Sequence, residues 1–89
     1  MARFLVLTTF TSQEARAQHR APHREYLNAQ VEAGTLLMTG PFGDESGGMI
    51  IFEAPDQAAV DAIMTADPFS TNNVFATVDI KPVTVVAGS

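Results

Sequence analysis

The sequence has no cysteine, few basic residues and no long hydrophobic run. Without cysteine there are no disulfides, thiolate metal sites or thiol nucleophiles. Only five basic residues accompany ten acidic ones, and the formal net charge of −5 would repel a nucleic-acid backbone or an anionic membrane surface. The apolar run Phe4-Leu5-Val6-Leu7 is too short for a signal-peptide core or a membrane-spanning helix. We therefore expect a cytoplasmic protein with neither nucleic acid nor membrane as a partner.

The length and composition favour one folded domain that associates with a second copy. A chain of 89 residues is the size of a single small domain, and we expect residues 1–89 to form one unit. Hydrophobic residues make up 46% of the chain and charged residues 17%, which excludes disorder. One small core would not hide that many apolar side chains, so an oligomer is expected.

The first third of the chain predicts a strand followed by a helix. In Arg3 to Phe10 both alternating sets of side chains are largely apolar, as in a central strand covered on both faces. Thr11 and Glu14 have the spacing of a capping box, so a helix is expected to begin there and run to about residue 20. Pro22 then either kinks this helix or begins a second one, which would place His23 in a newly started turn. Helical spacing continues to Gly34, a suitable terminator.

The remaining two thirds predict a hairpin, a helix and a last strand. Residues 35–39 and 48–53 are extended in character and are joined by a turn-rich segment, 40–47. Asp56 is a good helix cap, and the apolar stripe behind it predicts a helix that ends near Asp67-Pro68. Residues 74–86 alternate as a strand does, with Pro82 marking a bend or an edge.

The order β-α-β-β-α-β indicates an α+β protein with the ferredoxin-like fold. In this arrangement a four-stranded antiparallel sheet carries both helices on one face. The other face would also be apolar here, because the first strand and the hairpin strands have apolar residues on both sides. We expect a homodimer formed through these sheet faces.

His23 and Asp67 are the candidate pair for proton transfer. A histidine titrates near neutral pH, and a carboxylate beside it would orient the ring and favour its charged form. Both residues have ordinary explanations too: a solvated or capping histidine, and an aspartate that forms a turn before proline. Their separation in sequence does not decide whether they meet, although antiparallel helices would bring position 67 near position 23.

Other polar residues are weaker candidates. Arg20 is expected to bind the negative charge of a substrate, whereas Arg24 is interpreted as a solvated helix charge. Tyr26 and Ser70 are further substrate-binding candidates. His19 and His23 do not predict a metal site, because Pro22 interrupts the turn between them and the nearby arginines repel a cation. We expect neither a metal nor another cofactor.

Three groups of residues give the chain a family resemblance. They are Arg20-x-x-His23, Gly34-x-Leu36 leading to Gly40-Pro41, and Asp67-Pro68-Phe69 followed by Lys81-Pro82. In this order and separation they resemble the YciI-like proteins of the dimeric α+β barrel superfamily. The resemblance implies a ferredoxin-like protomer, a dimer, and an active-site histidine and aspartate that correspond to His23 and Asp67. One branch of the family resembles enzymes that eliminate chloride from a chlorinated hydroxyquinol, and lactone isomerases occur elsewhere in the superfamily.

Three functional hypotheses follow. The first is an enzyme that transfers a proton on a small anionic substrate, by elimination or isomerisation, with His23 moving the proton, Asp67 assisting it and Arg20 holding the substrate. The second is a noncatalytic dimer that binds a small metabolite in the same pocket. The third is a dimer in which the polar pair is purely structural.

Overall fold

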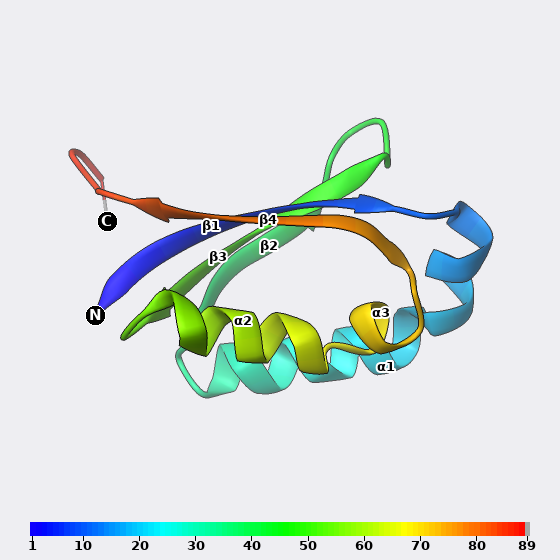
Figure 1. Cartoon of the computed structure of the whole chain (residues 1–89), viewed down its shortest axis with the longest axis horizontal. Helices are drawn as coiled ribbons and strands as arrows, with labels where there is room; N and C mark the ends of the chain where they lie inside the picture. The colour runs from blue at the N-terminus through cyan, green and yellow to red at the C-terminus, as the bar shows by residue number, and fades with distance from the viewer. Residues whose placement is uncertain (89) are drawn as a thin grey trace.

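The chain folds as a four-stranded antiparallel sheet with its helices on one face, as shown in Figure 1 by a computed structural model that describes residues 1–88. The sheet order is β2-β3-β1-β4, and the elements in chain order are β1 (Ala2–Phe10), α1 (Gln13–Glu32), β2 (Leu36–Pro41), β3 (Gly47–Ala54), α2 (Gln57–Ala66), α3 (Pro68–Thr71) and β4 (Phe75–Val83). This is the predicted ferredoxin-like β-α-β-β-α-β arrangement, with one short helix, α3, added before the last strand.

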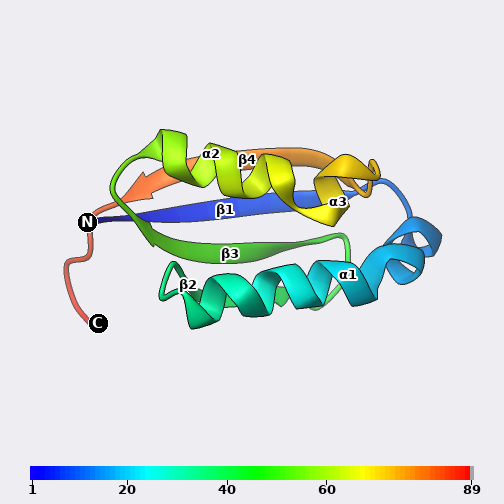
Figure 2. The same ribbon diagram turned by 90° about the horizontal axis from the view of Figure 1, so that it is seen from below.

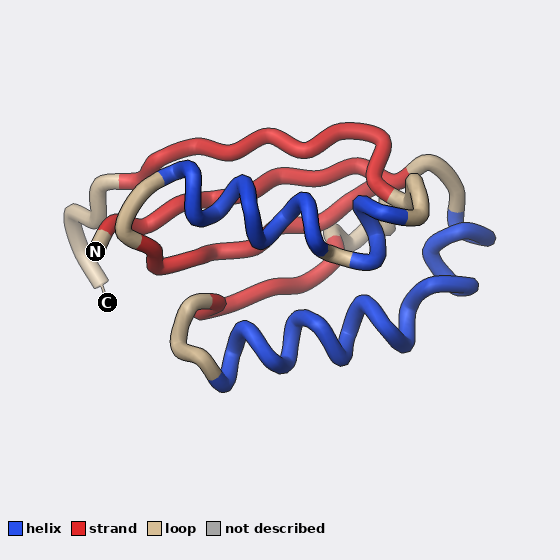
Figure 3. The backbone as a smooth tube through the Cα atoms, turned by 60° about the horizontal axis from the view of Figure 1, so that its bottom comes forward, coloured by secondary structure: helices blue, strands red, loops and turns tan. Residues whose placement is uncertain are grey.

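Strand β1 is central, as its two apolar faces predict. It pairs antiparallel with β3 on one side and with β4 on the other (Figure 3). Strand β4 lies at the edge of the sheet and ends at Val83, three residues earlier than the sequence pattern predicts. Pro82 is tolerated there because an edge strand leaves part of its backbone without a partner.

The start of α1 differs from the predicted capping box by one residue. Ser12 is the N-cap, and its hydroxyl accepts a hydrogen bond of 3.1 Å from the amide of Ala15. The Thr11 hydroxyl instead donates to the carbonyl of Asn73 at 2.8 Å, because the chain before β4 lies beside the end of β1. The end of the helix is as predicted: Gly34 has φ +80°, the left-handed conformation that terminates helices.

Pro22 lies inside α1 and does not begin a second helix. The helix is continuous from residue 13 to residue 32, so His23 is in its interior and not in a newly started turn. Figure 1 shows the first turns of α1 at an angle to the long remainder, as expected when an interior proline removes a hydrogen bond and crowds the preceding turn.

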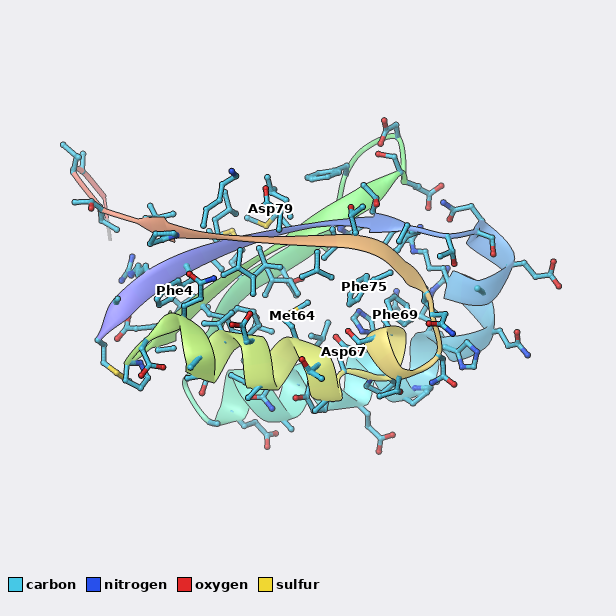
Figure 4. All side chains as sticks on the ribbon, viewed as in Figure 1. Phe4, Met64, Asp67, Phe69, Phe75 and Asp79 are labelled. Atoms are coloured by element: carbon cyan, nitrogen blue, oxygen red, sulfur yellow. The ribbon has the colours of Figure 1, made fainter. Side chains whose placement is uncertain are left out.

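The two long helices run antiparallel beneath the sheet. Figure 2 shows α1 along the β2 side and α2 along the β4 side, running in opposite directions. Asp56 caps α2 as predicted, accepting a hydrogen bond of 2.9 Å from the amide of Ala59. In Figure 4, Phe4 and Met64 lie between sheet and helices, within a core formed by Phe4, Val6, Leu27, Leu36, Ile50, Phe52, Ala54, Val60 and Met64. Within residues 1–88, no helix combines the length and apolar character needed to cross a membrane.

Candidate functional site

His23 and Asp67 are in direct contact. The Nδ1 atom of His23 lies 2.7 Å from Oδ1 of Asp67, although 44 positions separate the two residues in sequence. Because α2 runs antiparallel to α1, its carboxyl end lies beside the first half of α1 (Figure 2). Asp67 lies just beyond that end, so the antiparallel helices bring position 67 to position 23, which the sequence alone did not decide.

The backbone around Asp67 holds its carboxylate in place. Asp67 is both the C-cap of α2 and the N-cap of α3. Its Oδ1 accepts a hydrogen bond of 2.9 Å from the amide of Phe69. Pro68 occupies the first turn of α3, where its lack of an amide hydrogen costs nothing. One carboxylate oxygen thus accepts from both the backbone and the imidazole.

The Asp67 carboxylate is fully buried, and only one of its two oxygens is hydrogen-bonded. Asp67 has 0% exposure, and among the described residues its Oδ2 has no hydrogen-bond partner. A buried oxygen without a hydrogen-bond partner lowers the stability of the fold. Such groups are rare, and they are found most often at functional sites. The imidazole is held on its other side too, because it stacks on the ring of Phe69 at a centroid distance of 3.6 Å and an angle of 2°.

This contact sets the role of each ring nitrogen of His23. With Nδ1–H donating to an ionised Asp67, the Nε2 atom keeps its lone pair and can accept a proton. Only 14% of the His23 side chain is exposed, and that part faces a cleft of about 370 Å³. A histidine oriented by a buried carboxylate and open to a cleft can act as a general base and then as a general acid.

The cleft lies between α1 and the helix-facing side of the sheet. Its wall near His23 is aromatic, formed by Phe10, Phe69 and Phe75, whose ring centroids lie 5.5 to 6.3 Å apart. Figure 4 shows the labelled Phe69 and Phe75 near Asp67, around α3. The remaining lining residues include Thr8, Leu27, Asn28, Val31, Thr39, Gly40, Pro41, Gly48, Met49 and Ile50.

Three arginines of α1 line the same cleft. Arg16 is buried and pairs with Glu45 at 3.1 Å, with its guanidinium 4.7 Å from the centre of the Phe10 ring. Arg20 and Arg24 have no ion pair among the described residues. Arg24 is exposed, as its interpretation as a solvated charge requires, but it also borders the cleft. Its spacing of four residues from Arg20 is the feature of the sequence that indicates this shared side of α1.

Tyr26 and Ser70 are not among the residues that line the cleft. The Tyr26 hydroxyl donates to the carbonyl of Ile63 at 2.8 Å, and the Ser70 hydroxyl donates to the carbonyl of Met64 at 2.5 Å. Both bonds tie neighbouring helices to the last turn of α2. The two hydroxyls that sequence analysis assigned to substrate binding therefore already serve main-chain carbonyls.

A pH effect follows from the position of Tyr26. Burial, and secondarily the negative charge of Asp67, raise the pKa of Tyr26 above its usual value of 10.0. A raised pKa in the folded state gives stability that is complete below the unfolded pKa and is lost as the pH rises through the folded pKa. We expect Tyr26→Phe to lower the free energy of unfolding by about 1 kcal/mol at neutral pH, through the lost hydrogen bond.

The same variant should also lose less stability than the wild type as the pH rises above about pH 10, where Tyr26 begins to ionise in the unfolded wild type. Urea unfolding at a series of pH values measures both effects. Parallel stability curves for the two proteins above about pH 10 would contradict this account of Tyr26.

Within residues 1–88, no three histidine, aspartate or glutamate side chains are placed to hold a metal ion together. The site combines an oriented imidazole, an aromatic wall and two guanidinium groups that have no acidic partner among the described residues, and an imidazole in this setting is suited to proton transfer. An anionic ring is the kind of ligand that such a lining accommodates.

Known structures share this fold. A chain described as the 5-chloro-2-hydroxyhydroquinone dehydrochlorinase TftG of Burkholderia phenoliruptrix AC1100, in complex with 2,5-dihydroxybenzoquinone, aligns with a TM-score of 0.77 and 23% identity over 89% of this chain and 90% of that chain. An antibiotic biosynthesis monooxygenase aligns with a TM-score of 0.61 and 19% identity over 96% and 99% of the two chains. PA3566 of Pseudomonas aeruginosa aligns with a TM-score of 0.61 and 16% identity, over 96% and 93%.

At these identities the structures establish a common fold and no more. No curated protein matches the chain in sequence. The model of the YCII-related domain, however, matches residues 2–84, which span every strand and helix described above, including both members of the His23–Asp67 pair. The chain therefore belongs to the YCII-related domain family.

Proposed function

We propose that this protein is an enzyme that transfers a proton on a small anionic ring compound, leading to elimination or isomerisation. The observation that carries the proposal is the hydrogen bond from His23 to buried Asp67, with the free side of the imidazole on the cleft. The description of TftG as a dehydrochlorinase, an enzyme that removes hydrogen chloride, is consistent with this class of reaction for a chain of the same fold.

Each residue has a defined role in the proposed reaction. Nε2 of His23 removes a proton from the substrate, and the electron pair left behind either expels a leaving group such as chloride or shifts a double bond. Asp67 keeps Nδ1 protonated and stabilises the imidazolium that forms. Arg20 binds the negative charge of the substrate. In isomerisation the imidazolium returns its proton to a different atom of the substrate, and in elimination it releases the proton to water.

Turnover of three compound classes tests the proposal. Small lactones, hydroxyquinols and chlorinated hydroxyquinols are incubated with the enzyme, and ultraviolet spectra and chloride release are followed against buffer alone. We expect one class to react faster with the enzyme than in buffer. Tight binding of a compound that remains unchanged, with no turnover in any class, would instead favour the noncatalytic metabolite-binding hypothesis.

We also propose that two protomers associate through the free faces of their sheets, in the cytoplasm. Leu5, Leu7, Met38, Met49 and Ile51 share the face opposite the helices, as the strand register requires. Met38 is 59% exposed, and no helix covers this face in Figure 1. An apolar sheet surface of this kind is usually buried against a partner.

The association predicts a particle of twice the 9.5 kDa chain mass in light scattering at micromolar concentration. Ile51→Arg should shift the particle to the monomer mass, because it places a charge between Leu5 and Met38 on this face. Ala58→Arg, on the exposed side of α2, serves as the matched control and should remain a dimer. A wild-type monomer would contradict the proposal.

A further inference from the structure

We propose that the cleft selects a planar dianion, with Arg20 and Arg24 each binding one of its two negative groups. This inference rests on the proposed function only in taking the cleft as the substrate site. It specifies the class of substrate, and it assigns a binding role to Arg24.

The first observation is the distribution of positive charge. The chain carries a formal net charge of −5 and has only five basic residues, yet three of them line this one cleft. The three are Arg16, Arg20 and Arg24, which recur every four residues and so project from one side of α1. None of the lining residues that the structure describes is an aspartate or a glutamate. The cleft is therefore a positively charged site on a negatively charged protein.

The second observation is which of these charges are available. Arg16 is already engaged by Glu45 at 3.1 Å, by the side-chain carbonyl of Gln13 at 3.1 Å and by the Phe10 ring. Outside the cleft both remaining basic residues are paired, Arg3 with Glu53 and Lys81 with Asp79. Across residues 1–88, Arg20 and Arg24 are thus the two side chains with a permanent positive charge and no acidic partner.

The spacing of the two free arginines sets the geometry of the ligand. Residues four apart on a helix are separated by a rise of about 6 Å, and like charges at that spacing repel each other. A ligand with two negative groups at opposite ends of a six-membered ring matches this rise and removes the repulsion. A ligand with one negative group would leave one arginine unsatisfied.

The aromatic wall explains why the ligand should be planar. Phe10 and Phe75 lie beside Phe69, which stacks on the imidazole of His23. A flat ring that enters between this wall and α1 can contact aromatic faces and edges while its charged groups reach the arginines. Its edge would also lie next to the histidine that the proposed reaction uses.

Calorimetric titration with simple aromatic acids tests the proposal without requiring a reaction. The probes are benzoate, with one carboxylate, phthalate, with two adjacent carboxylates, and terephthalate, with two opposite carboxylates. We expect terephthalate to bind at least about 10-fold more tightly than benzoate, with phthalate between them, because only terephthalate satisfies both arginines. The preference should weaken as salt is raised.

Two variants and a matched control locate the effect. Arg20→Gln and Arg24→Gln should each reduce terephthalate affinity about 10-fold and bring the terephthalate-to-benzoate ratio close to one. Arg3→Gln changes the net charge equally but lies outside the cleft, so the ratio should be kept. Unchanged thermal unfolding of the two cleft variants would show that the loss does not come from misfolding.

The outcomes separate this proposal from the proposed enzymatic function. His23→Gln removes the proton acceptor but leaves both arginines, so its preference for terephthalate should persist even if no reaction is found. Equal affinity for the three acids, no binding below about 10 mM, or an unchanged ratio in Arg24→Gln would each overturn the two-arginine site. Turnover of a substrate with two opposite negative groups at wild-type kcat/KM in Arg24→Gln would overturn it as well.

Discussion

Replacing His23 with glutamine is expected to lower kcat by about 10²- to 10⁴-fold for whichever substrate the wild type converts, with little change in KM. Glutamine can still donate a hydrogen bond to Oδ1 of Asp67, and it has nearly the volume of the imidazole, so the site should remain assembled. It cannot take up a proton near neutral pH. A loss confined to kcat is what removal of a general base produces.

His19→Gln is the matched control for this experiment. It makes the same substitution one helical turn earlier on α1, at a residue that does not line the cleft. We expect kcat and KM of this variant to remain at wild-type values, and circular dichroism should show both variants folded. Equal rates for the variants at positions 19 and 23 would remove His23 from the reaction.

The fold followed from the sequence because its determinants are local. Alternation of apolar residues, the turn-rich segment after Thr39, the Asp56 cap and the glycine at position 34 each act within a few residues. The sequence predicted the wrong helix cap where a segment distant in sequence forms a hydrogen bond with the same side chain. The Thr11 hydroxyl bonds to the chain before β4, which leaves the helix cap to Ser12.

Pro22 shows the same limit for helices. A proline predicts a disturbance but not its form, because tertiary packing on both sides decides whether the helix bends or breaks. Here α1 continues through it. His23 therefore belongs to the same helical face as residues 16, 20 and 27, all of which line the cleft. If the helix broke at residue 22, helical spacing could not have placed these residues on one face.

The candidate site was predictable in part. The family resemblance pointed to positions 23 and 67, and the structure joins them. The Phe69 ring beneath the imidazole, and the role of Phe10 and Phe75 as its neighbours, come from three separate elements and have no local signature. The hydrogen bonds of the Tyr26 and Ser70 hydroxyls were not predictable either, because sequence does not show which main-chain carbonyl a hydroxyl meets.

Removing the carboxylate of Asp67 is expected to lower the free energy of unfolding substantially. Asp67→Ala would leave the amide of Phe69 without its acceptor at the start of α3 and would leave Nδ1 of His23 without its partner. The loss of the helix cap and of the hydrogen-bond partner of His23 Nδ1 together costs about 2–4 kcal/mol. Relief of the unpartnered Oδ2 offsets a part of this cost. Urea unfolding of the wild type and the variant at neutral pH measures the difference.

Asp67→Asn separates the structural role of this residue from its role in the reaction. The asparagine carbonyl can accept both hydrogen bonds that Oδ1 accepts, and its amide group replaces the unpartnered oxygen, so stability should remain within about 1 kcal/mol of the wild type. The negative charge that stabilises the imidazolium is lost, however. Without that charge the imidazolium that forms during the reaction is less stabilised, so kcat should fall by at least about 10-fold.

This combination of near-normal stability and reduced kcat is the signature of a positioning residue for the reaction. A purely structural pair predicts the reverse, in which Asp67→Asn destabilises the fold as much as Asp67→Ala and leaves ligand binding and kcat at wild-type values. Near-normal stability with reduced kcat is the outcome we expect. Asp67 is fully buried with one oxygen unpartnered, and a residue that only caps a helix would not need a buried charge.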